Sequence, residues 1–243
     1  MKQAVRRLAQ AGRLCYRTDF GTSYLDIAID GPVKVSEHVF LKPPRIASVA
    51  GPGQLDVLLE KGAAFGRGDH PTTQLAIQLI DGLLHERPWQ RKMRSVMALD
   101  IGTGSGVLAI AAAKMGVGRI QAVDIDPCAV FEARANIRLN GVEDQVVVID
   151  NLQETGSACC DLIVANLRTP TLMALLPRIV NMAATGSALI FSGIRGEETG
   201  RLRKRYRAAG FFERKICSEK GWCACLLVRG ESQRHPTERI SRY

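Results

Sequence analysis

The sequence lacks several features that identify large classes of proteins. Its longest apolar runs, such as VLAIAAAKM, are far too short to span a bilayer. The basic amino terminus MKQAVRRLAQAGR is not followed by the apolar segment of a signal peptide. The seven cysteines include no CxxC pair, and no histidine lies at zinc-site spacing from them. These absences predict a cytoplasmic protein with reduced thiols, no disulfide framework and no metal site.

Positive charge is in excess and is unevenly distributed. The 243 residues include 33 Lys and Arg against 24 Asp and Glu, which gives a net charge of +9. The densest basic block is RLRKRYR at 201–207. Two interpretations stay open for this block: a contact surface for RNA or the ribosome, or a solvated helix face. No membrane partner is expected.

Strand-like and helix-like segments alternate after a break rich in Pro and Gly at 42–53. The strand-like segments are short and apolar or β-branched, and they lie at 95–100, 119–124, 145–150, 161–166 and 187–192. This alternation predicts a parallel sheet with helices on both faces. Two further strands, at 211–218 and 222–228, are joined by a short EKG turn and should form an antiparallel hairpin. The predicted fold is α/β and doubly wound, with a mostly parallel seven-stranded sheet that ends in this hairpin.

Three regions are expected along the chain. Residues 1–53 would form a short N-terminal region and linker, with a helix at 2–12 and a strand near YLDIAID. Residues 54–230 would form the α/β domain. The polar segment 231–243 would be a disordered basic tail.

The clearest functional signal is the stretch LDIGTGSGVLAIAAA. A strand that ends at Asp100 leads into Gly102, Gly104 and Gly106 and then into an alanine-rich helix. The glycines allow backbone to approach a ligand closely, and the helix N-terminus offers unpaired N–H groups. The spacing differs from the G-x-G-x-x-G of dinucleotide-binding proteins, and no GK[ST] of a P-loop is present. An acidic residue followed by GxGxG is typical of Rossmann-like class I methyltransferases that use S-adenosyl-L-methionine.

A second acidic residue supports this cofactor. The strand after the glycine loop ends in AVDID, which places Asp124 at its tip. A carboxylate in this position can accept hydrogen bonds from both ribose hydroxyls. Asp100, near the start of the loop, suits the zwitterionic methionine half of the cofactor better than it would suit a phosphate. We therefore predict that S-adenosyl-L-methionine is the cofactor.

Five segments in order resemble the ribosomal protein L11 methyltransferase family. They are AAFGRGDHPTT, VDIDPCAVFEARANIRLNG, DLIVANLRTPTL, ALIFSGI and GFFERKICSEKGWCACLL. The resemblance implies methyl transfer to amines of a ribosomal protein, either lysine side chains or the N-terminal amine. Arg67 stands where the family usually has threonine, and RPWQRK makes the connection before the first sheet strand longer and more basic. The family also carries a longer N-terminal substrate-recognition domain, where this chain has residues 1–62 before the first segment.

The resemblance also assigns candidate site residues. Thr73, Gly102, Asp124 and Asn166 fall where the family binds the cofactor. The loop that closes over the cofactor would contain Phe65, Gly66 and His70.

Several roles follow from the residue types themselves. Asn166, at the tip of the fourth strand, offers an acceptor that can orient an amine nucleophile, although a residue that only ends the strand is the alternative. His70 is either a base or a structural hydrogen-bonding residue of the loop. Asn151 is expected near the adenine amino group, and Thr72 or Thr73 is expected to cap the following helix.

Other functions remain open on the sequence alone. A methyltransferase acting on RNA or on a small molecule is the main alternative, although the chain lacks the N/D-P-P-Y/F run that stacks a flipped base. A non-catalytic module that kept the fold is a further alternative.

Overall fold

The computed structural model describes residues 14–19, 22–27, 31–60, 62, 64–66, 68–155 and 159–230. The predicted helix at 2–12, Arg67 and the tail at 231–243 lie outside this part of the chain. Among the helices described, none combines the length and the apolar character needed to cross a membrane.

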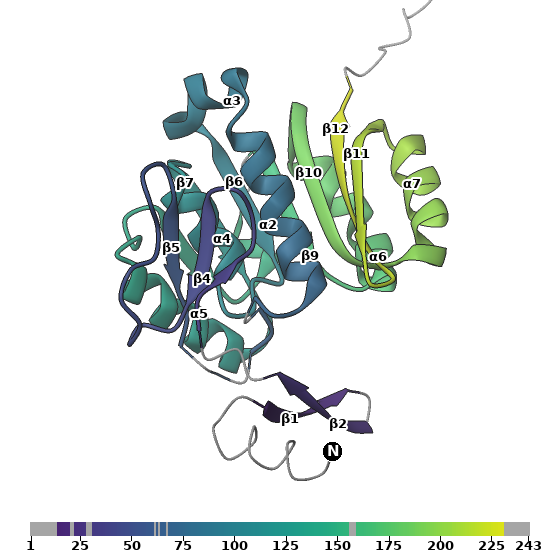
Figure 1. Ribbon diagram of the computed structural model, residues 1–243. Coiled ribbons are helices and arrows are strands. Elements are labelled where there is room, and N and C mark those ends of the chain that lie inside the picture. The colour runs from purple at the N-terminus through teal and green to yellow at the C-terminus, as the bar shows by residue number, and fades with distance from the viewer. Residues whose placement is uncertain are drawn as a thin grey trace, which may run out of the picture.

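Seven strands form the central sheet, in the spatial order β11-β12-β10-β9-β6-β7-β8 (Figure 1). Their bounds are β6 Met97–Ile101, β7 Arg119–Val123, β8 Val146–Ile149, β9 Cys160–Asn166, β10 Ala183–Arg195, β11 Phe211–Glu219 and β12 Trp222–Arg229. Strands β6 to β10 pair in parallel, whereas β12 runs antiparallel to both of its neighbours, β10 and β11. The predicted seven-stranded, mostly parallel sheet with a final antiparallel hairpin is confirmed.

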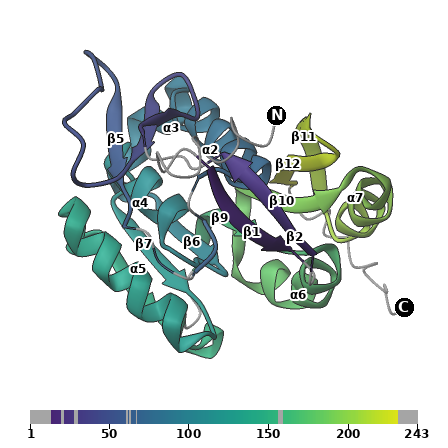
Figure 2. The same ribbon diagram turned by 60° about the horizontal axis from the view of Figure 1, so that its bottom comes forward.

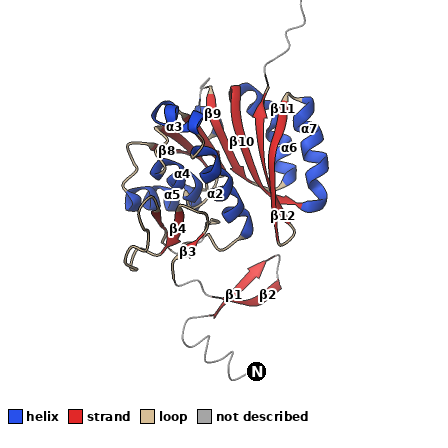
Figure 3. Ribbon diagram, turned by 45° about the horizontal axis from the view of Figure 1, so that its top comes forward, coloured by secondary structure: helices blue, strands red, loops and turns tan. Residues whose placement is uncertain are grey.

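Helices cover both faces of this sheet. Their bounds are α2 Pro71–Leu84, α3 Arg87–Lys92, α4 Val107–Lys114, α5 Pro127–Asn140, α6 Thr169–Met182 and α7 Thr199–Ala208. Short 3-10 turns lie at η1 Met93–Ser95, η2 Leu152–Thr155 and η3 Gly196–Glu198. Helices α2, α4 and α5 lie on one face, and α6 and α7 lie together on the other (Figures 1, 2 and 3).

The period-two alternation of side chains along a strand supplies both faces with apolar residues. In β9, Leu162 and Val164 pack with the core beneath α2, α4 and α5. Their neighbours Ile163 and Ala165 pack with the core beneath α6 and α7. This explains why DLIVAN reads as a continuous apolar run rather than an alternating one, as is typical of strands buried on both faces.

A smaller sheet precedes the central one, and the sequence did not predict it. It consists of β3 Val33–Lys34, β4 Val39–Lys42 and β5 Leu55–Leu58, with β4 and β5 parallel. Val39 and Val57 are fully buried and join the core of α2 and α4. Strands of two to four residues show too little periodicity to be recognised. The paired strands β4 and β5 lie on either side of residue 53 in the chain. The division of the chain at residue 53 stays a prediction.

Near the amino terminus, β1 Leu14–Asp19 pairs antiparallel with β2 Thr22–Ile27. The second of these strands overlaps the strand predicted near YLDIAID.

Cysteines in the described sheet behave as small core residues. Cys223 and Cys225 are buried in the core beneath α6 and α7, as the sequence predicts for two residues on one strand face. Burial raises the pKa of Cys225 to about 12 and that of Cys160 to about 11. These thiols are therefore neutral and unreactive at physiological pH.

Tyr206 fastens α7 to α6. Its side chain is fully buried, packs edge-on against Phe191, and donates a hydrogen bond of 2.8 Å from its hydroxyl to the Leu172 carbonyl oxygen.

We expect Tyr206→Phe to lower the free energy of unfolding by about 1 kcal/mol, the net contribution of one buried hydrogen bond. Urea denaturation followed by circular dichroism measures the change. Phe212→Leu is the control, because Phe212 lies on the neighbouring strand and is 51% exposed. Equal effects of the two substitutions would contradict this role for the hydroxyl.

Candidate functional site

The predicted site residues meet at one edge of the central sheet. The glycine loop follows β6, Asp124 follows β7, and Asn166 is the last residue of β9. These strands are parallel neighbours, so their carboxyl ends lie together. The chain runs outward from β6 to β8 and then returns to β9 on the other side of β6. Ligands of open α/β sheets bind at such a switch point.

The glycine loop adopts a backbone that other residues rarely adopt. Gly102, Gly104 and Gly106 have φ values of +73°, +56° and +83°. A Cβ on Gly102 would lie 2.5 Å from the Leu167 side chain, and one on Gly104 would lie 2.5 Å from the Phe65 carbonyl oxygen. Glycine is therefore required both for the turn and for the close approach of two neighbouring segments.

Asp100 supports the loop from beneath. It is 2% exposed, and its Oδ2 accepts hydrogen bonds from the Thr103 hydroxyl at 2.7 Å and the Ala109 amide at 3.2 Å. Its Oδ1 is also buried but has no hydrogen-bond partner among the described residues. Burial raises the pKa of Asp100 to about 6, although both hydrogen bonds act to lower it. An unpaired buried carboxylate oxygen has acceptor capacity left for a hydrogen-bond donor.

Asp124 joins the loop to the next strand. Its Oδ2 accepts a hydrogen bond from the Gly104 amide at 2.9 Å, and its Oδ1 accepts one from the Asp126 amide at 3.1 Å. Each carboxylate oxygen can accept a second bond. The next residue along the chain, Ile125, presents an apolar side chain to solvent and is 86% exposed.

The segment before α2 lies directly on the glycine loop. The Ser105 amide donates to the Phe65 carbonyl at 2.9 Å, and the Ser105 hydroxyl donates to the Gly66 carbonyl at 3.0 Å. The Phe65 side chain remains 53% exposed. The loop at 64–66 therefore forms one wall of the site through its backbone.

His70 caps α2, so the predicted cap at Thr72 or Thr73 is wrong. The His70 Nδ1 accepts hydrogen bonds from the Thr72 amide at 3.3 Å and the Thr72 hydroxyl at 2.7 Å. Pro71 takes the first helical position, where its missing N–H costs nothing, and this places the cap at His70, directly before Pro71. The ring of His70 also meets the edges of Phe65 and Trp222. These contacts support a structural role for His70 rather than a role as a base.

Asn166 lies against the first turn of α2. Its Nδ2 donates to the hydroxyl of the buried Thr73 at 3.5 Å, which turns the side-chain carbonyl Oδ1 toward Gly193. A Cβ on Gly193, whose φ is +83°, would lie 2.6 Å from the Leu167 carbonyl oxygen and 3.1 Å from Asn166 Oδ1. The glycine of ALIFSGI thus makes room for the Asn166 segment.

Asn151 lies after β8 at the same edge of the sheet. It is exposed, and its Oδ1 accepts the Gln153 amide at 3.0 Å in a local turn. The Asn151 backbone therefore lies at the carboxyl edge of the central sheet, while the Asn151 side chain stabilises the turn at 151–153.

Two asparagines of α5 support the site, and sequence reasoning did not give them this role. Asn136 is fully buried; its Nδ2 donates to the Ser105 carbonyl at 2.9 Å, and its Oδ1 accepts the Glu60 amide at 3.1 Å. Asn140 makes two hydrogen bonds with the backbone of Leu58. The signal was present as two asparagines at i and i+4, which share one helix face.

Sequence reasoning also did not predict the pairing of Arg195 with Trp222 beside the site. The Arg195 guanidinium stacks 3.7 Å from the centre of the Trp222 ring, which in turn contacts His70. The start of β12 and the end of β10 thus extend the wall that Phe65 and His70 begin.

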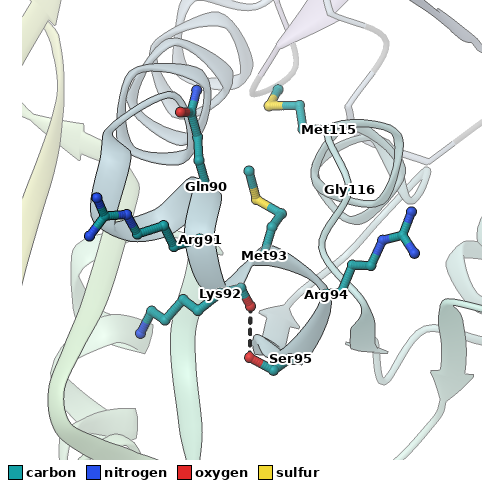
Figure 4. A pocket seen from close by; sticks show the side chains of 8 residues that line it. All are labelled: Gln90, Arg91, Lys92, Met93, Arg94, Ser95, Met115 and Gly116. Atoms are coloured by element: carbon teal, nitrogen blue, oxygen red, sulfur yellow. Dashed lines mark hydrogen bonds between the residues drawn. The ribbon is translucent and has the colours of Figure 1, made fainter.

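A separate hollow of about 530 Å³ lies at the other end of α4, beside η1 (Figure 4). Met93 lies at the centre of this view, and the Arg91 and Arg94 side chains point outward. The hollow is at the amino ends of the parallel strands, so it is not the site that the fold prepares for a ligand.

The strand order, the reversed β12 and the acidic glycine-rich loop define a Rossmann-like class I methyltransferase fold. The chain belongs to the ribosomal protein L11 methyltransferase family. The model of that family, described as ribosomal protein L11 methyltransferase (PrmA), matches residues 29–230.

Individual relatives agree with this assignment. A ribosomal protein L11 methyltransferase from Pelotomaculum thermopropionicum is 38% identical over 194 residues, which are 79% of this chain and 60% of that protein. One from Geotalea uraniireducens is 34% identical over 206 residues, 83% of this chain and 65% of the relative. This chain therefore spans less than two thirds of the length of these curated relatives.

A solved structure has the same fold. The crystal structure of a ribosomal protein L11 methylase from Lactobacillus delbrueckii subsp. bulgaricus superimposes with a TM-score of 0.72 at 28% identity. The superposition covers 82% of this chain and 99% of that one.

We expect Gly104→Ala to separate the Phe65 segment from the glycine loop. Both this variant and Gly141→Ala incur the strain of alanine at positive φ, about 1–2 kcal/mol, but Gly141 has no atom within 4 Å of its Cβ position. Loss of global stability accelerates amide hydrogen exchange in both variants. Beyond that common effect, the Ser105 amide should exchange at least about tenfold faster in Gly104→Ala than in Gly141→Ala. Equal protection in the two variants would argue against the contact.

The raised pKa of Asp100 predicts a specific pH dependence. Between about pH 4 and pH 6 the folded state binds more protons at Asp100 than the unfolded chain, so the free energy of unfolding falls as pH rises through this window, by up to about 3 kcal/mol. Asp100→Asn should abolish this component in urea denaturation at a series of pH values. Asp144→Asn, at an exposed position, is the control and should keep the wild-type profile. A wild-type profile for Asp100→Asn would contradict the assignment.

Proposed function

We propose that this protein transfers a methyl group from S-adenosyl-L-methionine to amines of ribosomal protein L11. The observation that carries the proposal is the buried, unpaired Asp100 Oδ1 beneath a glycine loop at the switch point of the sheet. Membership of the family supplies the substrate, which is named in its description.

The residues at the edge fit this cofactor. Asp100 offers an oxygen for a cationic amino group, and Asp124 has acceptor capacity left for ribose hydroxyls. Gly102, Gly104 and Gly106 form the turn between these two carboxylates, at positive φ and without side chains. We assign these five residues to cofactor binding.

Residues around the loop complete the proposed binding site. Phe65 and Ile125 present exposed apolar side chains that the adenosine half would cover. Gly66 and His70 hold the Phe65 segment in place, and Thr73 borders the site through its contact with Asn166. Asn151 lies beside the expected adenine position.

When bound, the cofactor supplies a methyl group that its sulfonium already activates. The protein then has to present a neutral amine in line with that methyl, because a protonated amine has no lone pair. A lysine amine has an ordinary pKa of about 10.4, which burial among apolar groups and a nearby positive charge lowers. Leu167 and Phe65 supply apolar surroundings at this edge.

Asn166 is the proposed catalytic residue. Thr73 fixes its amide group, so that the Oδ1 atom can accept a hydrogen bond from the amine and aim the nitrogen lone pair. Orientation is the main contribution available to the protein, because the reaction needs no oxyanion and no acid.

The substrate class rests on the family. Its description names a ribosomal protein, which favours protein over RNA or a small molecule as the acceptor. Contact with RNA or the ribosome through 201–207, a cytoplasmic location, and a methyltransferase domain at 54–230 remain predictions.

A transfer assay tests the proposal. The chain is incubated with methyl-labelled S-adenosyl-L-methionine and either purified ribosomal protein L11 or ribosomal RNA. We expect label on the protein, at lysine side chains or the N-terminal amine by mass spectrometry. Label on RNA alone, or cofactor binding without transfer to any acceptor, would refute the proposed reaction.

We expect Asn166→Ala to lower kcat at least about 100-fold, because a misplaced nucleophile loses most of its orientation advantage. The free energy of unfolding should change by less than about 1 kcal/mol, since the side chain is only half-buried and makes one long hydrogen bond. Asn181→Ala, at an exposed position of α6, should leave kcat unchanged. Normal turnover in Asn166→Ala would remove Asn166 from the mechanism.

A further inference from the structure

Two histidines and an aspartate converge away from the proposed cofactor site. His38 lies in the turn between β3 and β4, Asp81 lies in the last turns of α2, and His85 ends that helix. One potential ligand atom from each lies within 4.8 Å of the other two. Asp81 is two helical turns from Thr73, about 12 Å along α2.

The geometry centres on one carboxylate oxygen. Asp81 Oδ1 lies 2.9 Å from His38 Nδ1 and 2.8 Å from His85 Nδ1. Asp81 Oδ2 accepts a hydrogen bond from the His38 backbone amide at 3.2 Å, which fixes the orientation of the carboxylate. Outer hydrogen bonds of this kind orient the ligands in protein metal sites.

The carboxylate is buried. Asp81 is 3% exposed, and its two oxygens face the His38 backbone amide and the His38 ring.

The two imidazole rings are stacked over each other. Their centres are 3.8 Å apart and their planes differ by 13°. His38 Nδ1 is hydrogen-bonded to Asp81 Oδ1, whereas His85 Nδ1 is hydrogen-bonded to the Asp81 main-chain carbonyl oxygen at 2.9 Å and also lies 2.8 Å from Oδ1. Both partners are acceptors, so in the ion-free state each ring carries its proton on Nδ1. A buried carboxylate is stabilised by hydrogen bonds or by a cation, and its charge is costly without them.

We propose that His38, Asp81 and His85 bind one divalent transition-metal ion, of the zinc class. Two imidazole nitrogens and one carboxylate oxygen are a donor set that such ions prefer, with water in the remaining position. The ion neutralises the Asp81 carboxylate.

Binding requires a change of tautomer and a rotation of the rings. Each histidine moves its proton from Nδ1 to Nε2, which frees the Nδ1 lone pair and releases no net proton from a neutral ring. The rings must also turn out of their parallel stack, because a bound ion lies in the plane of each ring. The side chains of His38 and His85 are 26% and 40% exposed, which gives them room to turn and lets Nε2–H face water.

The ion would fasten the turn between β3 and β4 to α2. The sequence predicts no metal site, and this proposal departs from that prediction. The proposal is independent of the methyl-transfer reaction, because none of the three residues lies at the carboxyl edge of the central sheet.

Cobalt titration of the complete chain tests the site. The thiols are first blocked with iodoacetamide, because exposed cysteines such as Cys128 and Cys159 also bind such ions. We expect one Co²⁺ per chain at micromolar free ion, with visible d–d absorption and no thiolate charge-transfer band. Competition with Zn²⁺ should remove the absorption.

Two variants and two controls locate the ion. Asp81→Asn and His85→Gln should each weaken Co²⁺ binding more than about 100-fold. Loss of a residue that only hydrogen-bonds to a metal ligand would weaken binding by about 10- to 100-fold. Glu37→Gln, at an exposed acid beside His38, and His70→Gln, at the α2 cap, should bind Co²⁺ as the wild type does. Circular dichroism checks that each variant is folded.

Several results would overturn the proposal. They are no binding of Co²⁺ by the folded wild-type chain, binding that disappears with the blocked thiols, and undiminished binding in both Asp81→Asn and His85→Gln. If the imidazole proton resonances of the wild type shift with pH but do not shift on addition of Zn²⁺, the cluster binds protons and not a metal ion.

Discussion

The buried carboxylate of Asp100 is the constraint on which the carboxyl edge of the sheet depends. One of its oxygens holds both the Thr103 hydroxyl and the Ala109 amide, and so fixes the turn from β6 into α4. Only that turn, with glycines at positive φ, lets Leu167 and the Phe65 carbonyl approach so closely. The second oxygen has no hydrogen-bond partner among the described residues, and burial raises the pKa of the group to about 6. We propose that this oxygen receives the cationic group of the cofactor.

Segments far apart in the chain are fastened to this turn by polar side chains rather than by apolar packing alone. Asn136 joins the glycine loop to the strand end at Glu60, and Ser105 joins it to the Phe65 segment. Ser192, at the end of β10, donates to the Thr72 carbonyl at 2.7 Å and so holds the start of α2. Buried polar networks of this kind specify one arrangement, because every misplacement leaves a polar group unpaired.

Helix α2 connects the two places where we propose chemistry. Its first turn carries Thr73, which positions Asn166, and its last turns carry Asp81, which gathers the two histidines. The helix is mostly buried, and it packs against β10, β12 and α4 and against the turn before β4, so both ends are held in a rigid setting. The proposed ion and the proposed cofactor would therefore act on opposite ends of the same element.

The sequence by itself determined the central sheet, its reversed last strand, and the acidic glycine loop, because apolar periodicity and glycine spacing are local properties. It also placed Asp124 and Asn166 at strand tips, and parallel strands bring such tips to one edge. The cap of α2 at His70 rather than at a threonine is also a local matter, because Pro71 takes the first helical position and the cap precedes it. Only the tertiary structure decided the small β3-β4-β5 sheet and the meeting of His38 with Asp81, 43 residues apart, because packing between distant segments brings them together.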